Sequence, residues 1–294
     1  MLAKNLFAAL LIYYHLAIFG ENIVKLKNYF HFAGKKIFYT DQGRGPVIVL
    51  IHGYLETSEV WEDFAGSLED SFRVLAIDLP GHGNSDIFNH THTMEFMADV
   101  TEALLNVTGT DRAFVTGHSM GGYVTLAFLE KFPHKLTGYC LFHSHPFADT
   151  PEVLKRREND IRMVEGGKKF MLYPDAVKRM YADINLEKIH DAFERSKRIA
   201  SGIRDEGITA VLRGMMARPS RVHLMEAGKV PCLWILGAKD NYIQCESMKT
   251  RVKLPPNAEL IILENSGHMG FIEEKEKSLE VMKNFLRKID FKSF

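Results

Sequence analysis

Cysteine is scarce in this sequence, and its few cysteines form no pattern. The chain has only three, Cys140, Cys232 and Cys245, and no two are spaced as CxxC. An odd count without paired spacing argues against a disulfide scaffold, and the apolar runs around Cys140 and Cys232 indicate buried thiols. A chain that does not depend on disulfides suits a reducing compartment, so we expect a cytoplasmic location.

The sequence also lacks an excess of either charge. Lys and Arg number 37, as do Asp and Glu, so the net charge is zero with histidine neutral. Such a balance gives no electrostatic footprint for nucleic acid or an anionic membrane surface, and we expect no nucleic-acid partner. Apolar residues make up 46% and charged residues 25% of the chain, which is typical of a globular protein. No pattern indicates an oligomeric state.

No apolar run reaches the length of a membrane span. Residues 6–20 are apolar apart from His15, but a span needs about 20 residues. This run would suit a signal-peptide core, yet no small-x-small cleavage site follows it. We expect a non-cleaved apolar helical extension over residues 1–27. Membrane contact, membrane association or export through residues 1–20 is the alternative.

Short apolar runs alternate with helical patterns through most of the chain. Val47–Ile51 reads VIVLI, a continuous run that suits a parallel strand covered on both faces. Similar runs lie at residues 74–77, 113–116, 138–142, 232–236 and 260–263. Strands that alternate with helices predict an α/β fold with a parallel sheet.

One segment, residues 146–228, has helical patterns and no convincing strand. We interpret it as a helical cap inserted into a core made of residues 28–145 and 229–294. Six of the thirteen methionines lie in residues 151–225, with sixteen Lys and Arg against eleven Asp and Glu. A Met-rich, slightly basic lid suits an acyl chain with an anionic or polar head. Ordinary lid packing with a solvated charged face is the alternative.

The motif with the clearest chemistry is GHSMG at residues 117–121. It has the form G-x-S-x-G and lies between a predicted strand and a predicted helix. The glycines allow strand and helix to approach closely, and the sharp turn exposes the serine. Ser119 is the predicted nucleophile. The helix N-terminus places the Met120 N–H where an oxyanion forms.

Two later loops offer the partners that a nucleophilic serine needs. His268 follows the predicted strand 260–263 and would act as the base, and Asp240 follows 232–236 and would orient it. The order serine, aspartate, histidine is typical of one hydrolase fold. Tyr54, in the loop after VIVLI, is the predicted second oxyanion donor through its backbone N–H.

Four other side chains are candidates for lining the substrate pocket. His143 and His145 follow the predicted strand 138–142, Trp61 follows the Tyr54 loop, and Met269 neighbours the predicted base. Packing in a loop or core is the alternative for the two histidines and the tryptophan. No set of cysteine, histidine and carboxylate residues at ligand spacing predicts a metal site.

Five segments together resemble the α/β-hydrolase superfamily: LIHGYLETSEVW, AIDLPGHGNSD, VTGHSMGGYVTLAF, ILGAKDNYI and SGHMGFIEE. They are most similar to its small, capped, esterase- and lipase-like bacterial members. The resemblance implies a mostly parallel eight-stranded sheet flanked by helices, and neither a metal nor an organic cofactor.

The function expected from these motifs is hydrolysis of a carboxylic ester, or a related small acyl substrate, through an acyl-enzyme. Carbon–carbon bond hydrolysis and cofactor-free haloperoxidase chemistry use the same triad and stay open. A non-catalytic ligand receptor on this fold is the alternative of another class. Dehalogenases and epoxide hydrolases of similar fold use an aspartate nucleophile, so a serine at position 119 argues against both.

Overall fold

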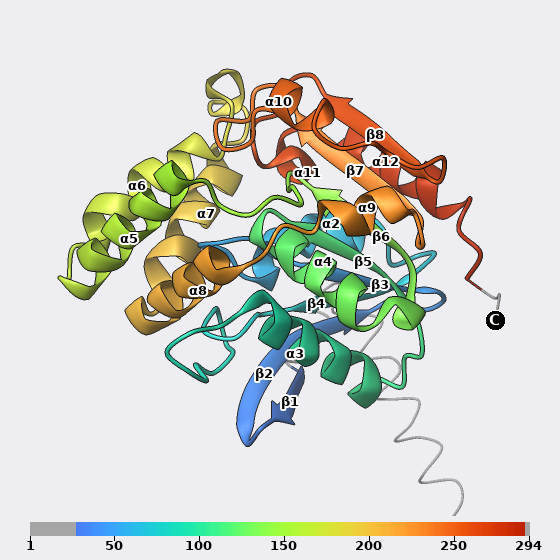
Figure 1. The fold of residues 1–294 in the computed structure, drawn as a ribbon, viewed down its shortest axis with the longest axis horizontal. Coiled ribbons are helices and arrows are strands. Elements are labelled where there is room, and N and C mark those ends of the chain that lie inside the picture. The colour runs from blue at the N-terminus through green and yellow to red at the C-terminus, as the bar shows by residue number, and fades with distance from the viewer. Residues whose placement is uncertain (1–27, 292–294) are drawn as a thin grey trace, which may run out of the picture.

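The computed structural model describes residues 28–291, which form an eight-stranded sheet with helices on both faces (Figure 1). The strand order is β1-β2-β4-β3-β5-β6-β7-β8. The strands are β1 (Asn28–Phe32), β2 (Lys35–Gln42), β3 (Val47–Ile51), β4 (Arg73–Ile77), β5 (Ala113–His118), β6 (Leu136–Phe142), β7 (Cys232–Gly237) and β8 (Ala258–Leu263). β2 pairs antiparallel with both β1 and β4, and all other pairings are parallel. The predicted mostly parallel sheet is confirmed.

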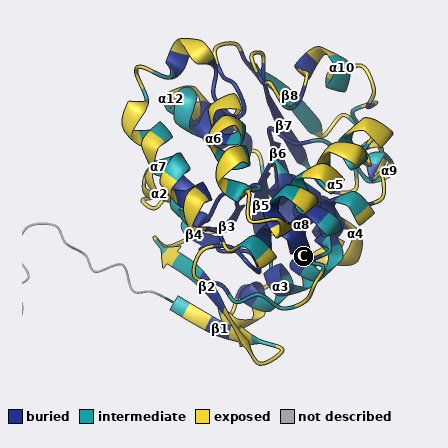
Figure 2. Cartoon of the chain, turned by 90° about the vertical axis from the view of Figure 1, so that its left-hand side faces the viewer, coloured by how far each residue is buried: buried dark blue, intermediate teal, exposed yellow. Residues whose placement is uncertain are grey.

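The strands are continuously apolar because helices cover both faces of the sheet. Every residue of β5, β6 and β7 is buried. Figure 2 shows this buried layer between α2 (Glu62–Gly66) and α12 (Lys275–Leu286) on one side and α3 (Met94–Val107), α4 (Met120–Lys131) and α9 (Val222–Ala227) on the other. Short elements complete the fold: η1 (Ser58–Trp61), η2 (Pro133–Lys135), α10 (Cys245–Lys249) and α11 (Gly270–Glu273).

The helical insertion, residues 146–228, lies between β6 and β7. Besides α9 it contains α5 (Pro151–Glu165), α6 (Lys169–Arg179), η3 (Asp183–Asn185), α7 (His190–Gly202) and α8 (Asp205–Ala217). Helix α5 packs on α8 and helix α6 on α7. These four helices form one group beside the sheet, at the left of Figure 1.

Two expectations concern the ends and the thiols of the chain. Across residues 28–291, no helix combines the length and apolarity that crossing a bilayer requires. The predicted apolar extension of residues 1–27 lies outside the described residues. All three cysteines are free and buried, as the apolar runs around two of them indicate.

Candidate active site

Ser119 occupies the sharp turn between β5 and α4. Its backbone φ angle is +49°, a left-handed value that residues other than glycine rarely adopt. A Cβ atom on Gly117 would collide with the Gly121 carbonyl, and one on Gly121 would collide with the Ile51 carbonyl. The Ser119 N–H donates to the Phe142 carbonyl at 2.9 Å. The turn therefore needs both glycines, and the sheet holds its strained serine in place.

His268 and Asp240 form a buried hydrogen-bonded pair next to this turn. His268 Nδ1 donates to Asp240 Oδ2 at 2.7 Å. The other carboxylate oxygen accepts the backbone N–H groups of Tyr242 at 2.7 Å and Ile243 at 3.0 Å. Because Nδ1 carries the proton that Asp240 accepts, Nε2 is left as the basic nitrogen of the neutral ring.

Burial and mutual attraction act in opposite directions on the pKa values of this pair. Burial alone would raise the pKa of Asp240, but the charge of His268 and the hydrogen bonds from His143 and His268 lower it well below its usual value. Burial alone would lower the pKa of His268, but the charge and hydrogen bond of Asp240 raise it above the ordinary value. The carboxylate thus stays ionised and makes the imidazole more basic.

One cavity of about 260 Å³ has both Ser119 and His268 in its wall. Tyr54, one of the two predicted oxyanion donors, lines the same cavity. Met120 is the first residue of α4, a position whose N–H has no partner within the helix. The structure therefore places Ser119, Tyr54 and His268 around one space and Met120 directly after the serine, while their catalytic roles remain predictions.

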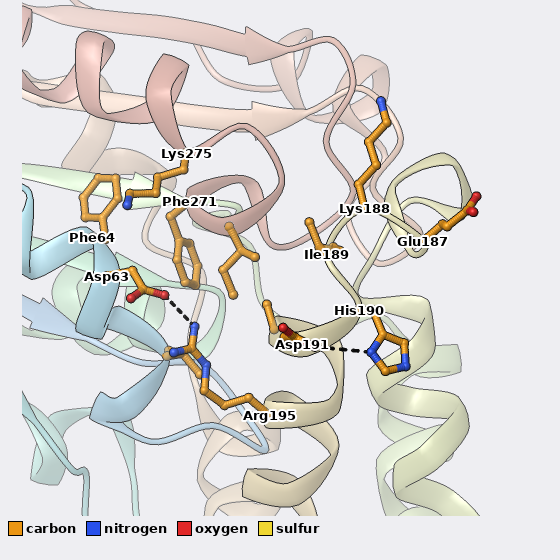
Figure 3. Close-up of a pocket in the computed structure, with 13 residues that line it drawn as sticks. Asp63, Phe64, Glu187, Lys188, Ile189, His190, Asp191, Arg195, Phe271 and Lys275 are labelled. Carbon is orange, nitrogen blue, oxygen red and sulfur yellow. Dashed lines mark hydrogen bonds and ion pairs between the residues drawn. The ribbon is translucent and has the colours of Figure 1, made fainter.

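A second hollow is larger, about 680 Å³, but contains none of the predicted catalytic residues. It lies between α2, α11 and the start of α7 (Figure 3). Its wall carries charges of both signs, and across it Arg195 reaches Asp63 at 2.9 Å. We assign the candidate active site to the smaller cavity, because reacting groups must line the space that the substrate enters.

The known proteins to which this chain is similar include hydrolases of the α/β-hydrolase fold. A sequence model described as alpha/beta hydrolase fold matches residues 46–160. The malate-bound structure of a thermophilic esterase from Thermogutta terrifontis is 27% identical, with a TM-score of 0.83 over 89% of this chain and 97% of its own. The chain has the α/β-hydrolase fold.

The sequence relatives of this chain are named for more than one hydrolytic activity. Lipase 1 of Psychrobacter immobilis is 26% identical over 86% of this chain and 81% of its own length. A 2-hydroxy-6-oxononadienedioate/2-hydroxy-6-oxononatrienedioate hydrolase from Paraburkholderia phymatum is 25% identical over 85% of this chain and 91% of its own. The α/β-hydrolase fold alone therefore leaves the substrate open.

The four pocket candidates do not all reach the cavity beside Ser119. His145 lines it and hydrogen-bonds the Tyr123 hydroxyl at 3.1 Å. Trp61, His143 and Met269 are fully buried and do not line this cavity. Trp61 and His143 thus follow the packing alternative, and Met269 is not the pocket residue that it was expected to be. Trp61 stacks on Phe271 with ring centroids 4.0 Å apart. Closeness in sequence to a catalytic loop does not decide on which side of the backbone a side chain lies.

His143 supports the catalytic aspartate candidate from a second side. The Gly270 N–H donates to His143 Nε2 at 3.1 Å, so the ring proton is on Nδ1, which lies 3.5 Å from Asp240 Oδ2. That distance allows only a weak hydrogen bond. Burial lowers the pKa of His143 to about 4, with Asp240 opposing, so the ring is neutral near pH 7.

Among residues 28–291, one group of side chains is spaced closely enough to hold a metal ion. Potential ligand atoms of His143, Asp240 and His268 lie within 4.8 Å of one another. A metal would need Nδ1 of His268 without the proton that it shares with Asp240. The hydrogen bonds are those of an aspartate that orients a histidine, and we assign the group that role.

A buried pair that the sequence did not reveal lies behind the site. His118 Nδ1 donates to Glu56 Oε2 at 2.9 Å, and His118 Nε2 donates to the His268 carbonyl at 2.8 Å. Both ring nitrogens face acceptors, so the ring is doubly protonated and pairs with an ionised Glu56. Burial alone would raise the pKa of Glu56, but the charge and hydrogen bond of His118 lower it. Glu56 also accepts the Gly53 N–H.

Proposed function

We propose that this protein is a serine hydrolase that cleaves carboxylic esters through an acyl-enzyme on Ser119. One observation carries the proposal: Ser119, in a strained turn, and His268, oriented by Asp240, line the same cavity. A serine hydroxyl is a weak nucleophile at neutral pH, and a neighbouring base of suitable pKa activates it.

In the proposed reaction, Ser119 Oγ attacks the ester carbonyl while His268 Nε2 takes the hydroxyl proton of Ser119. The backbone N–H groups of Tyr54 and Met120 stabilise the oxyanion, and the imidazolium formed is stabilised by Asp240. Collapse of the tetrahedral intermediate breaks the bond to the alcohol, which receives the proton from His268. Water, deprotonated by the same nitrogen, then releases the acid and restores the serine.

The helical insertion is proposed to act as a cap over this site. Residues of α5, α6 and α8 contribute to the cavity wall, including Val153, Leu172 and Met215. The backbone N–H of His268 also donates to the Met180 carbonyl at 2.7 Å, so the loop that contains His268 is hydrogen-bonded to the insertion. The volume of about 260 Å³ suits an acyl chain of small to moderate size.

Replacement of the serine tests the proposal directly. We expect Ser119→Ala to lower kcat for p-nitrophenyl esters by at least about 10⁴-fold, because nucleophile and base act as one unit. The wild-type protein should react with a fluorophosphonate probe, and the variant should not. Ester hydrolysis at the wild-type rate in Ser119→Ala would contradict the proposal.

Carbon–carbon bond hydrolysis is the second candidate, favoured by the similarity to the 2-hydroxy-6-oxononadienedioate/2-hydroxy-6-oxononatrienedioate hydrolase. It uses the same three side chains, so a substrate pair separates the two. Faster turnover of vinylogous diketones than of simple esters would favour this candidate. A ligand receptor would accept the fluorophosphonate label but turn over neither substrate.

A further inference from the structure

The cavity beside Ser119 has an unusual wall for an esterase pocket. Helix α5 presents Val153, Arg156, Arg157 and Asp160 to it, at the i, i+3, i+4, i+7 spacing of a single helical face. A face directed at an apolar ligand would be apolar along its length. Here three of its four side chains are ionisable, and two of those are arginines.

Positive charge is in excess throughout this wall. Four arginines line the cavity, namely Arg156, Arg157, Arg179 and Arg251, against two acidic residues, Asp149 and Asp160. The excess is local, because the whole chain has a net charge of zero.

One of the two acids is already shared between two arginines. Asp149 Oδ2 accepts from Arg157 Nε at 2.7 Å, and its Oδ1 lies 2.7 Å from a guanidinium nitrogen of Arg218. The side chains are nearly inaccessible: Asp149 is 3% exposed, Arg218 2% and Arg157 12%. Two guanidinium groups on one carboxylate leave one buried positive charge uncompensated, which is costly unless an anion pairs with it.

The neighbouring histidine does not add to this charge. Burial, and next the charge of Arg218, lower the pKa of His145 to about 3, so its ring is neutral near pH 7. Within residues 28–291, no carboxylate other than that of Asp149 lies within ion-pair distance of Arg157 or Arg218. Asp160, the second acid of the wall, is attracted to Arg156, Arg157 and Arg179. Two acids therefore face four arginines of the wall and the buried Arg218, and the remaining positive charge favours an anionic ligand.

Two other arginines are positioned so that their N–H groups can bind such an anion. The Arg251 guanidinium lies 3.8 Å from the Phe147 ring centroid, and that of Arg179 lies 5.4 Å from the Tyr242 ring centroid. An aromatic face orients a guanidinium while leaving its N–H edge free for a carboxylate. Arg179 also pairs with Asp175 at 3.1 Å, outside the cavity, so Arg156 and Arg251 carry the freer charges.

We propose that the substrate of this site is an ester that carries a second, anionic group, a carboxylate, which binds the arginine cluster of Arg156, Arg157, Arg179 and Arg251. The inference rests on the proposed esterase function and specifies its substrate class. The carboxylate belongs either to the acyl part, as in a half-ester of a dicarboxylic acid, or to the alcohol part. Both would meet the same guanidinium groups.

Pairs of esters that differ only in this charge test the proposal. For the acyl side, mono-p-nitrophenyl adipate is compared with its terminal carboxamide. For the alcohol side, 4-carboxyphenyl hexanoate is compared with 4-carbamoylphenyl hexanoate. We expect kcat/KM for the anionic ester to exceed that of its neutral partner by about tenfold or more in one of the two pairs, because a charge-assisted hydrogen bond discriminates by that order.

Variants on α5 and after α10 attribute the preference to the cluster. Arg156→Gln and Arg251→Gln, both at exposed positions, should each lower the anionic-to-neutral ratio several-fold. Lys155→Gln is the matched control: it removes one positive charge from the same helix at an exposed position outside the cavity lining, and should leave the ratio unchanged.

The outcomes separate the inference from the proposed function. Hydrolysis of the neutral esters at rates equal to or above those of the anionic ones, in both pairs, overturns the inference and leaves the esterase proposal standing. Absence of hydrolysis in all four esters overturns the esterase proposal. Calorimetry with adipate and hexanoate does not depend on turnover: tighter binding of adipate, weakened by Arg251→Gln, supports the cluster, and equal binding contradicts it.

Discussion

Four imidazole rings lie around this site, and the partners of each ring nitrogen determine what each histidine can do. His268 donates through Nδ1 to a carboxylate and keeps Nε2 basic, whereas His143 accepts a backbone N–H at Nε2 and is neutral. His145 is neutral because of burial and Arg218, and His118 faces two acceptors and donates to both. Only His268 combines a raised pKa with a place in the cavity wall beside the serine.

The pH dependence of the reaction should report on His268. The base works only in its neutral form, so kcat/KM should rise with pH through the pKa of this residue, with a midpoint above the ordinary value of about 6.5. Asp240→Asn removes the charge that raises this pKa. The midpoint should therefore move to lower pH, while the plateau falls by about 10⁴-fold because the imidazole loses its orientation.

A pH–rate profile for both proteins on one p-nitrophenyl ester checks this expectation. Far-ultraviolet circular dichroism controls for folding of the variant. An unchanged midpoint in Asp240→Asn would mean that another group titrates in the reaction.

At the scale of secondary-structure elements, the site depends on loops that lie far apart in the sequence. The β5–α4 turn carries Ser119, the loop after β3 carries Tyr54, and the loop after β8 carries His268. The Glu56–His118 pair connects all three, through the Gly53 N–H, the residue before the serine, and the His268 carbonyl. One buried ion pair thus connects the predicted oxyanion loop, the predicted nucleophile and the predicted base.

Loss of either partner of this pair should be strongly destabilising. Glu56→Gln and His118→Asn should each lower the free energy of unfolding by about 3 kcal/mol, because each leaves a buried charge uncompensated. The double variant should lose less than the sum of the two. Urea unfolding followed by tryptophan fluorescence measures all three.

An exposed ion pair provides the control for the Glu56 and His118 variants. Glu165 pairs with Arg213 at the surface, and Glu165→Gln should lower stability by less than about 1 kcal/mol. Strictly additive effects of the Glu56 and His118 substitutions would show that the two residues act independently, contrary to the role assigned here.

At the scale of the whole molecule, local patterns predicted the fold better than the pocket. The run VIVLI is β3, and the predicted strand at residues 113–116 lies in β5, because continuous burial leaves its mark on neighbouring residues. The Glu56–His118 contact joins residues 62 positions apart, and no spacing rule connects them. Trp61 was a candidate for the pocket wall with core packing as the alternative, and it packs on Phe271, a residue more than 200 positions later.

The charge distribution, like the pocket, could be predicted from the sequence only in part. A net charge of zero correctly describes the chain but conceals the arginine-rich cavity wall. The basic character of the insertion was readable from its composition. Which arginines face the cavity depends on how α5 and α6 pack over the sheet, and that follows only from the tertiary structure.

The central claim, a covalent acyl-enzyme on Ser119, is tested most directly by intact-protein mass spectrometry. Rapid acid quenching of the wild-type protein with a p-nitrophenyl ester should reveal a mass increase equal to one acyl group, located by proteolysis to the peptide that contains residue 119. The Ser119→Ala protein should show no such increase. An acyl group attached at another residue, or steady-state ester hydrolysis that survives in Ser119→Ala, would contradict the account.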